Sequence, residues 1–278
     1  VDMSPGSGLV YMRFSNDGST WSPWEAYSTS KSWNLTSGDG QKRVYAQFKD
    51  RVGLESSPPS SDDIVLDTTK PSIPSLSSPP NGTITNDNRP TFTWNPATDL
   101  TSGIASYTFQ VDTSPLFSSE NLRTITGIAT TSYKPDIPLR EGTWYWHVRA
   151  VDRAGNIGSW SDNWRLIVDV GPPSIENLKP ENNSYIKDNR PLISAIVKDA
   201  GSGIDNNTIR LTLDNIVKSH TYHPENGQVK YQEALAEGRH EVKLSVSDKA
   251  GNSRTVAWSF VVDTTPPAAP SLRLPENN

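Results

Sequence analysis

The chain repeats its own landmarks at intervals of about 95–102 residues. An acidic junction containing proline occurs three times, as Asp67-Thr-Thr-Lys-Pro71, Asp169-Val-Gly-Pro-Pro173 and Asp263-Thr-Thr-Pro-Pro267. Between junctions the order of landmarks is kept: Asp-Asn-Arg-Pro, an Asp shortly before Ser-Gly-Ile, a Glu-Gly pair, and Asp-x-Ala-Gly-Asn. Repetition at a fixed period indicates similar units arranged in series.

Aligning the landmarks divides the chain into modules. They lie at residues 71–170 and 173–264, with the start of a further module at 268–278 and, at 1–67, a module that lacks its first strands. The chain is therefore expected to be a window on a longer array, in which the missing strands are encoded upstream or supplied by another chain. With 22 Pro, 18 Gly and 33% hydrophobic residues, the composition favours several small cores over one large core.

Within a module, hydrophobic residues recur with a period of two, which is typical of strands with one buried face. One predicted strand places Trp144, Trp146, Val148 and Ala150 on a single face. Other runs alternate in the same way, and they include Tyr107 to Val111, Ile209 to Leu213 and His240 to Val246. About seven short strands in roughly 95 residues predict an all-β fold of tandem antiparallel β-sandwiches.

Several runs resemble known extracellular modules. They are residues 142–156, Gly-Thr-Trp-Tyr-Trp-His-Val-Arg-Ala-Val-Asp-Arg-Ala-Gly-Asn, the Asp-Thr-Thr-Pro-Pro junction, and residues 15–24 and 38–50. This pattern is similar to the fibronectin type III and bacterial Ig-like modules of surface proteins of bacteria and archaea. The resemblance implies an Ig-like or fibronectin III-like sandwich and a microbial extracellular or cell-surface location, and it leaves the function open.

Catalysis is not expected. Of the four histidines, His147 is predicted on an outward strand face and His240 on an inward face, while His220 and His223 have no third ligand at a suitable spacing. The sequence has no cysteine, no glycine-rich phosphate loop, no Gly-x-Ser-x-Gly elbow and no His-Glu-x-x-His motif. The chain is predicted not to be an enzyme and to require no cofactor.

Charge and hydropathy exclude two classes of partner. A net charge of −5 provides no basic surface for phosphate backbones, so no nucleic acid is expected to bind. No run approaches about 18 apolar residues, so no membrane span is predicted in this segment.

Acidic residues occupy loops that the sandwich topology would bring to module junctions. At the second junction the predicted group is Asp87, Glu141, Asp169, Asp199 and Asp248. At the first junction it is Asp67, Asp99 and Asp152. Carboxylate oxygens from several segments suit Ca²⁺, which takes six to eight oxygen ligands in flexible geometry. The arrangement resembles the interdomain sites of cadherins, although the cadherin linker Asp-x-Asn-Asp-Asn is absent.

Two alternatives stand beside the calcium hypothesis. The same Asp residues are good turn formers, because a carboxylate can accept backbone N–H bonds from residues two positions on. A second kind of site is an aromatic platform for sugars at Trp160 and Trp164, which lie near the last strand of their module.

The function predicted from these features is that of a non-catalytic spacer or stalk segment in a secreted or cell-surface repeat protein of the adhesin, S-layer or fibre type. Its partners would be further modules of the same polypeptide, other copies, or surface proteins and glycans. The alternative is a set of carbohydrate- or protein-binding accessory modules in a secreted enzyme.

Overall fold

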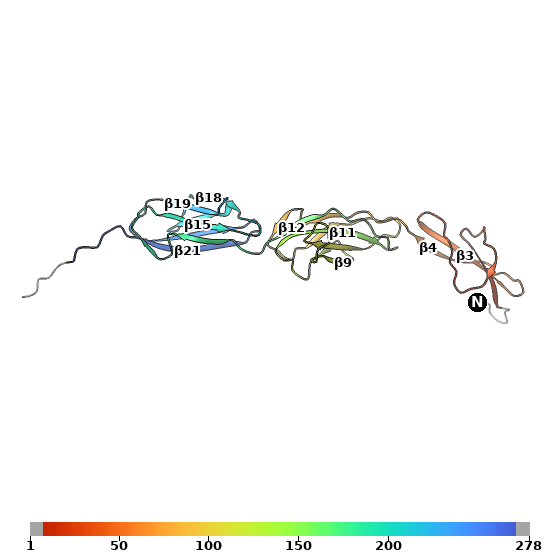
Figure 1. Ribbon diagram of the computed structural model, residues 1–278. Coiled ribbons are helices and arrows are strands. Elements are labelled where there is room, and N and C mark those ends of the chain that lie inside the picture. Colours follow the sequence, from red (N-terminus) through yellow and green to blue (C-terminus); the bar gives the residue numbers. More distant parts are fainter. Residues whose placement is uncertain (1–7, 271–278) are drawn as a thin grey trace, which may run out of the picture. The chain divides into compact units, whose positions relative to one another are not determined.

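The structure is a computed structural model that describes residues 8–270 (Figure 1). Strands dominate it, and the described residues contain a single short 3-10 helix, Asn206–Thr208. None of these residues forms a helix long and apolar enough to cross a membrane. The predicted start of a further module at 268–278 lies mostly outside the described residues.

The first four strands form one sheet with the order β2-β1-β3-β4. They are β1 (Leu9–Ser15), β2 (Glu25–Ala26), β3 (Gly40–Asp50) and β4 (Ser60–Leu66). All their pairings are antiparallel. Arg13 from β1 lies over the rings of Trp21 and Trp24, at 5.0 Å and 4.4 Å from the ring centroids, so a cation stacks on the aromatic pair of this segment.

The next eight strands form two sheets, with the orders β10-β7-β5 and β6-β12-β11-β8-β9. They are β5 (Ser75–Ser78), β6 (Thr83–Thr85), β7 (Phe92–Asn95), β8 (Ile104–Asp112), β9 (Arg123–Ile128), β10 (Ser132–Tyr133), β11 (Gly142–Asp152) and β12 (Trp164–Val168). Phe92, Trp94 and Phe109 are buried between the sheets with Trp146, whose ring centroid lies 4.9 Å from that of Phe92. The predicted inward face of β11 is confirmed, because Trp144, Trp146, Val148 and Ala150 are all at most 2% exposed.

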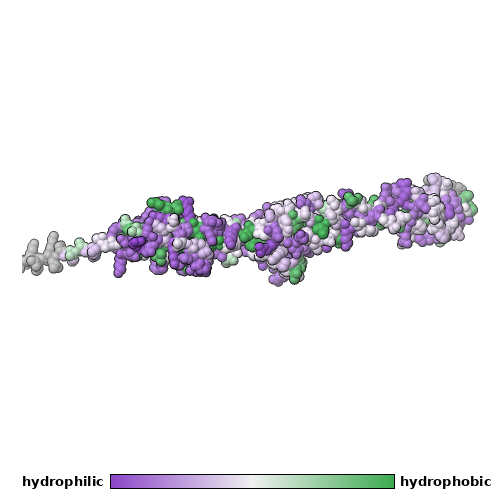
Figure 2. Space-filling view, turned by 90° about the horizontal axis from the view of Figure 1, so that it is seen from above, coloured by the Kyte–Doolittle hydropathy of each residue, from purple (hydrophilic) through white to green (hydrophobic). Residues whose placement is uncertain are grey.

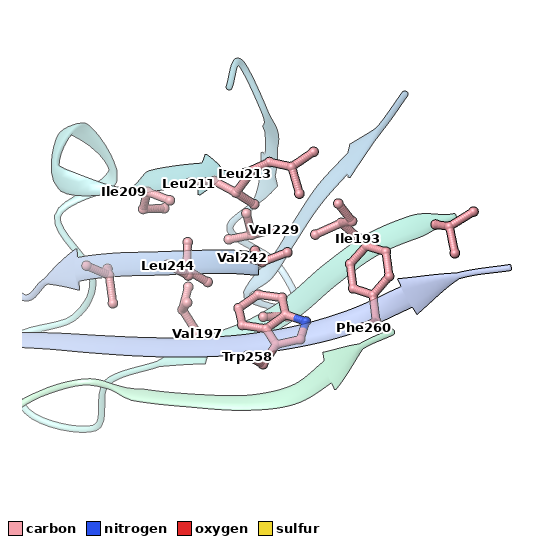
Figure 3. Packing of buried hydrophobic residues seen from close by; sticks show 13 residues of the cluster. Ile193, Val197, Ile209, Leu211, Leu213, Val229, Val242, Leu244, Trp258 and Phe260 are labelled. Carbon is pink, nitrogen blue, oxygen red and sulfur yellow. The ribbon is translucent and has the colours of Figure 1, made fainter. Parts of the chain in front are cut away.

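The last nine strands also form two sheets, ordered β13-β15-β19-β18 and β14-β21-β20-β16-β17. They are β13 (Ser174–Lys179), β14 (Ser184–Ile186), β15 (Leu192–Lys198), β16 (Arg210–Leu213), β17 (Ile216–Lys218), β18 (Thr221–His223), β19 (Gln228–Gln232), β20 (Gly238–Ser247) and β21 (Ser253–Val262). Side chains from both sheets meet in one core, where Trp258, Phe260, Val242 and Leu244 of one sheet pack with Ile193 and Val229 of the other (Figure 3). The predicted all-β sandwich class is confirmed by these layered sheets.

Two strand pairs depart from the predicted antiparallel arrangement. β6 runs parallel to β12, with Ile84 opposite Ile167. β14 runs parallel to β21, with Tyr185 opposite Val261. The departure follows from chain order: the first part of each repeat crosses to the second sheet after β5 or β13 and there meets the last strand of the same repeat.

By internal contacts the chain divides into two compact units. One holds the described residues up to 78 together with 92–133 and 146–164, and the other holds 79–91, 134–145 and the described residues from 165 onward. Figure 2 shows a mainly hydrophilic surface with small separate hydrophobic areas on the face in view. The module boundaries inferred from the sequence remain a prediction.

Candidate metal centres

The first carboxylate group, called here the first triad, consists of Asp67, Asp99 and Asp152. One oxygen from each carboxylate lies within 4.8 Å of the others. Asp67 directly follows β4, Asp99 lies in the loop between β7 and β8, and Asp152 ends β11. The structure therefore brings together all three residues that the sequence assigned to the first junction.

The loops of the first triad are closed by backbone donors. Asp99 Oδ1 accepts hydrogen bonds from the N–H groups of Ser102 and Gly103, both at 2.9 Å. Although burial acts to raise it, the pKa of Asp99 lies below its usual value, because these N–H groups and that of Thr101 favour the charged form. Asp152 Oδ1 accepts from the Asn156 N–H at 2.8 Å. Both carboxylates thus serve as turn formers, as the alternative hypothesis proposed.

The second triad consists of Asp169, Asp199 and Asp248, and its oxygens also lie within 4.8 Å of one another. Asp169 follows β12, Asp199 follows β15 and Asp248 follows β20. Asp169 and Asp248 are each 2% exposed. The equivalent loops of the repeats thus build the same constellation twice.

The two other acids predicted at the second junction behave differently. Glu141 Oε1 accepts a hydrogen bond from the Val170 N–H at 3.2 Å, and Glu141 lines the same surface pocket as Asp169 and Asp199. Asp87 accepts from the Arg89 N–H at 2.8 Å, within its own turn. Among the described residues, Asp87 does not belong to either triad.

Two asparagines complete the triads, and the sequence analysis assigned them no role. Asn156 Nδ2 donates to Asp152 Oδ2 at 2.9 Å and to the Asp67 carbonyl oxygen at 3.1 Å. Asn252 Nδ2 makes the equivalent bonds to Asp248 Oδ2 and the Asp169 carbonyl oxygen, each at 2.8 Å. Their recurrence at the end of Asp-x-Ala-Gly-Asn was the signal that could have identified them.

The aromatic platform predicted at Trp160 and Trp164 is occupied by side chains of the chain itself. Trp160 stacks on His147 with a centroid separation of 3.9 Å, and the Arg149 guanidinium lies 4.4 Å from the Trp160 ring. Trp164 meets the buried Trp146 edge to face at 5.8 Å. A sugar ring would have to compete with these contacts for the faces of Trp160.

His147 lies on the outer sheet face, as predicted, yet it is only 6% exposed. The ring is sandwiched between Phe117, at a centroid distance of 3.6 Å, and Trp160. Burial in this stack lowers the pKa of His147 from 6.5 to about 4, and the charge of Arg149 acts in the same direction. The side chain is nonetheless buried, because aromatic side chains from two loops cover it.

We expect the depressed pKa of His147 to make the fold acid-sensitive. Between pH 6.5 and about 4, His147 is protonated in the unfolded chain and neutral in the folded chain. The contribution of His147 to the free energy of unfolding is therefore fully present above pH 6.5 and is lost as the pH falls towards 4. The loss attributable to His147 should not exceed about 3 kcal/mol. Urea unfolding of the wild type and of His147→Phe at pH 7.5 and 4.5 measures it, since phenylalanine keeps a stacking ring and cannot titrate. An equal pH dependence in both proteins would contradict this assignment.

One part of the chain matches a family model. Residues 179–264 match the family described as Bacterial Ig-like domain. This match confirms the predicted resemblance over the segment that contains β14 to β21. No curated protein matches the chain.

Several solved structures are similar to this chain. The fibronectin(III)-like modules of Clostridium thermocellum CbhA share 17% identity at a TM-score of 0.33, over 68% of this chain and 93% of theirs. A tetra-tandem repeat from the extending region of a large adhesion protein shares 17% identity at a TM-score of 0.34, over 95% of this chain and 69% of its own. A 1.5-MDa bacterial ice-binding adhesin shares 12% identity at a TM-score of 0.32, over 92% of this chain and 87% of the solved one.

Proposed function

We propose that this chain is a load-bearing spacer segment of a secreted or cell-surface repeat protein, without catalytic activity of its own. Its partners would be further modules of the same polypeptide. The match of residues 179–264 to a bacterial Ig-like family supports an extracellular role of this kind. The observation that carries the proposal is the way in which the two ends of each repeat are paired.

In both repeats an early strand runs parallel to the last strand. β6 pairs with β12 over three residue positions, and β14 pairs with β21 over three positions. These two parallel pairs, called here the clamps, are extended by further backbone hydrogen bonds. The Gly82 N–H donates to the Arg165 carbonyl at 2.7 Å, and the Asp263 N–H donates to the Ile186 carbonyl at 2.9 Å. Each repeat therefore joins its entry to its exit directly.

Parallel pairing decides how such a clamp responds to tension. A force that pulls the chain apart at its two ends draws the early strand backward and the last strand forward, along the strand axes. All hydrogen bonds between the two strands are then loaded together in shear. In an antiparallel hairpin pulled at its open end, the bonds break one after another. The geometry is suited to a module that transmits load.

Single-molecule pulling on the full chain tests this function. The protein has no cysteine, so introduced cysteines are unique attachment points. With handles at Pro172→Cys and Pro266→Cys, force loads the β14–β21 pair in shear. We expect one abrupt unfolding event, with a contour-length gain of roughly 30 nm for a repeat of this size.

A second handle position provides the matched control. With handles at Ala236→Cys and Pro266→Cys, force acts at the open end of the antiparallel β20–β21 pair, where Gly238 lies opposite Val262. This geometry should unzip the pair at a clearly lower force. Equal forces in the two geometries would contradict a shear clamp, and a specific hit on a glycan array would favour the accessory-module alternative.

A further inference from the structure

The first triad contains a buried oxygen that has no hydrogen-bond partner. Asp67 is 8% exposed, and its Oδ2 atom is buried without a donor among the residues that the structure describes. Within residues 8–270, its Oδ1 atom accepts a hydrogen bond only from the Thr69 N–H, at 3.1 Å. A buried carboxylate oxygen without a donor is costly, because it has lost its hydration and gained nothing in exchange.

The charge of the first triad is also uncompensated. Within residues 8–270, no lysine, arginine or histidine nitrogen lies within 4.0 Å of a carboxylate oxygen of Asp67, Asp99 or Asp152. Asp67 and Asp99 are close enough for their carboxyl groups to interact directly. Carboxylates this close repel one another, and a bound cation would offset their charge.

The second triad differs from the first because a backbone donor reaches its junction carboxylate. Asp169 Oδ2 accepts the Ser202 N–H at 2.7 Å, so the residue equivalent to Asp67 is satisfied. This approach requires glycine at position 201, because a Cβ there would lie 2.4 Å from Asp169 Cγ. Asp169 therefore occupies the space that a side chain at residue 201 would fill.

The first triad has Thr101 where the second has Gly201. The Thr101 side chain fills the space that the Asp169 carboxylate occupies in the second triad, so Asp67 cannot lie in the equivalent position. The Ser102 N–H instead donates to Asp99 Oδ1 at 2.9 Å, and Asp67 Oδ2 stays buried without a donor among the described residues. The difference between Thr101 and Gly201 therefore decides whether the junction carboxylate accepts a hydrogen bond from the loop, as Asp169 does and Asp67 does not.

We propose that the first triad binds one hard divalent cation of the calcium class through Asp67, Asp99 and Asp152, and that the Ser202 N–H makes the second triad independent of metal. Three carboxylates supply the charge and part of an oxygen shell, and water completes the six to eight ligands that calcium takes. The site does not depend on the mechanical role proposed above. It would hold the residue after β4 to the loops that follow β7 and β11.

Calorimetric titration of the full chain with calcium, after treatment with chelator, tests the proposal. We expect one bound ion per chain in the wild type and a higher thermal midpoint in calcium than in chelator. Asp67→Asn keeps the size of the side chain and removes its charge, and it should weaken calcium binding by at least about tenfold. Asp169→Asn is the matched change in the second triad and should leave the affinity for calcium unchanged.

A second variant keeps the test decisive if Asp67→Asn fails to fold, which circular dichroism would reveal. Thr101→Gly removes the side chain that keeps Asp67 from the Ser102 N–H, and it should also weaken calcium binding by at least about tenfold. Absence of calcium binding to the wild type at millimolar concentration would overturn the proposal. A loss caused by Asp169→Asn, or by none of the variants, would overturn the assignment to the first triad.

Discussion

Replacing Trp146 with alanine is expected to destabilise the repeat that contains it by about 3–5 kcal/mol, the usual range for removing a large aromatic side chain from a packed core. Trp146 is 0% exposed, and its ring contacts Phe92, Phe109 and Trp164 at centroid distances of 4.9–6.0 Å. Truncation leaves a cavity among aromatic rings that cannot all move to fill it. Denaturant unfolding followed by tryptophan fluorescence measures the loss.

Trp146→Phe is the informative control. The indole Nε1 of Trp146 is buried and has no hydrogen-bond partner among the described residues, so the wild type already carries an unsatisfied donor. Phenylalanine removes that donor and keeps a stacking ring. Removing the unsatisfied donor offsets much of the cost of the cavity, which is smaller than the cavity left by alanine. We expect its stability to lie within about 1 kcal/mol of the wild type. A loss as large as that of the alanine variant would show that packing volume alone controls this position.

The second large effect is expected at Gly227, in the turn between β18 and β19. Its φ of +73° lies in the left-handed region, and a Cβ there would lie 2.2 Å from the Val197 carbonyl oxygen. That carbonyl belongs to the backbone of β15 and cannot rotate away, because the Val197 N–H donates to the Gly227 carbonyl at 2.8 Å. Gly227→Ala should therefore cost about 2–5 kcal/mol, the sum of left-handed strain and overpacking.

Gly127→Ala separates these two contributions. Gly127 has nearly the same φ, +74°, and no atom lies within 4 Å of the position that a Cβ would take. Its alanine variant should lose only the conformational part, about 1–2 kcal/mol. Thermal unfolding of both variants measures the difference. Equal losses would mean that backbone strain, and not the contact with Val197, accounts for the whole effect at Gly227.

The two triads show how a repeat can diverge without losing its architecture. Both keep the junction Asp, the loop Asp, the Asp that precedes Ala-Gly-Asn and the asparagine that ties them together. The change from Gly201 to Thr101 alters which carboxylate receives the loop N–H group. A family alignment that scored only the acidic positions would treat the two sites as equal, although their hydrogen bonding differs.

Much of the fold could be predicted from the sequence because strand alternation is a local property of the chain. Neighbouring side chains point to opposite faces of a strand, so a run such as Trp144 to Ala150 identifies its buried face without knowledge of any partner. The order of landmarks likewise placed Asp67, Asp99 and Asp152 in loops that meet. The repeats, the sandwich class and the membership of the first triad were determined at this level, whereas the group predicted at the second junction also held Asp87 and Glu141, which lie outside the second triad.

Only the tertiary structure decided which side chains are buried, which remote strands pair and which carboxylates find hydrogen-bond donors. The burial of His147 depends on Phe117 and Trp160, which reach it from separate loops. The parallel pairing of β6 with β12 depends on segments about 80 residues apart in the chain. Whether the junction carboxylate reaches a loop N–H depends on the space at one loop position, since a Cβ at Gly201 would lie 2.4 Å from Asp169 Cγ. Such distances arise from the packing of remote segments, and hydrogen bonding is steep enough in distance and angle that sequence pattern alone cannot specify them.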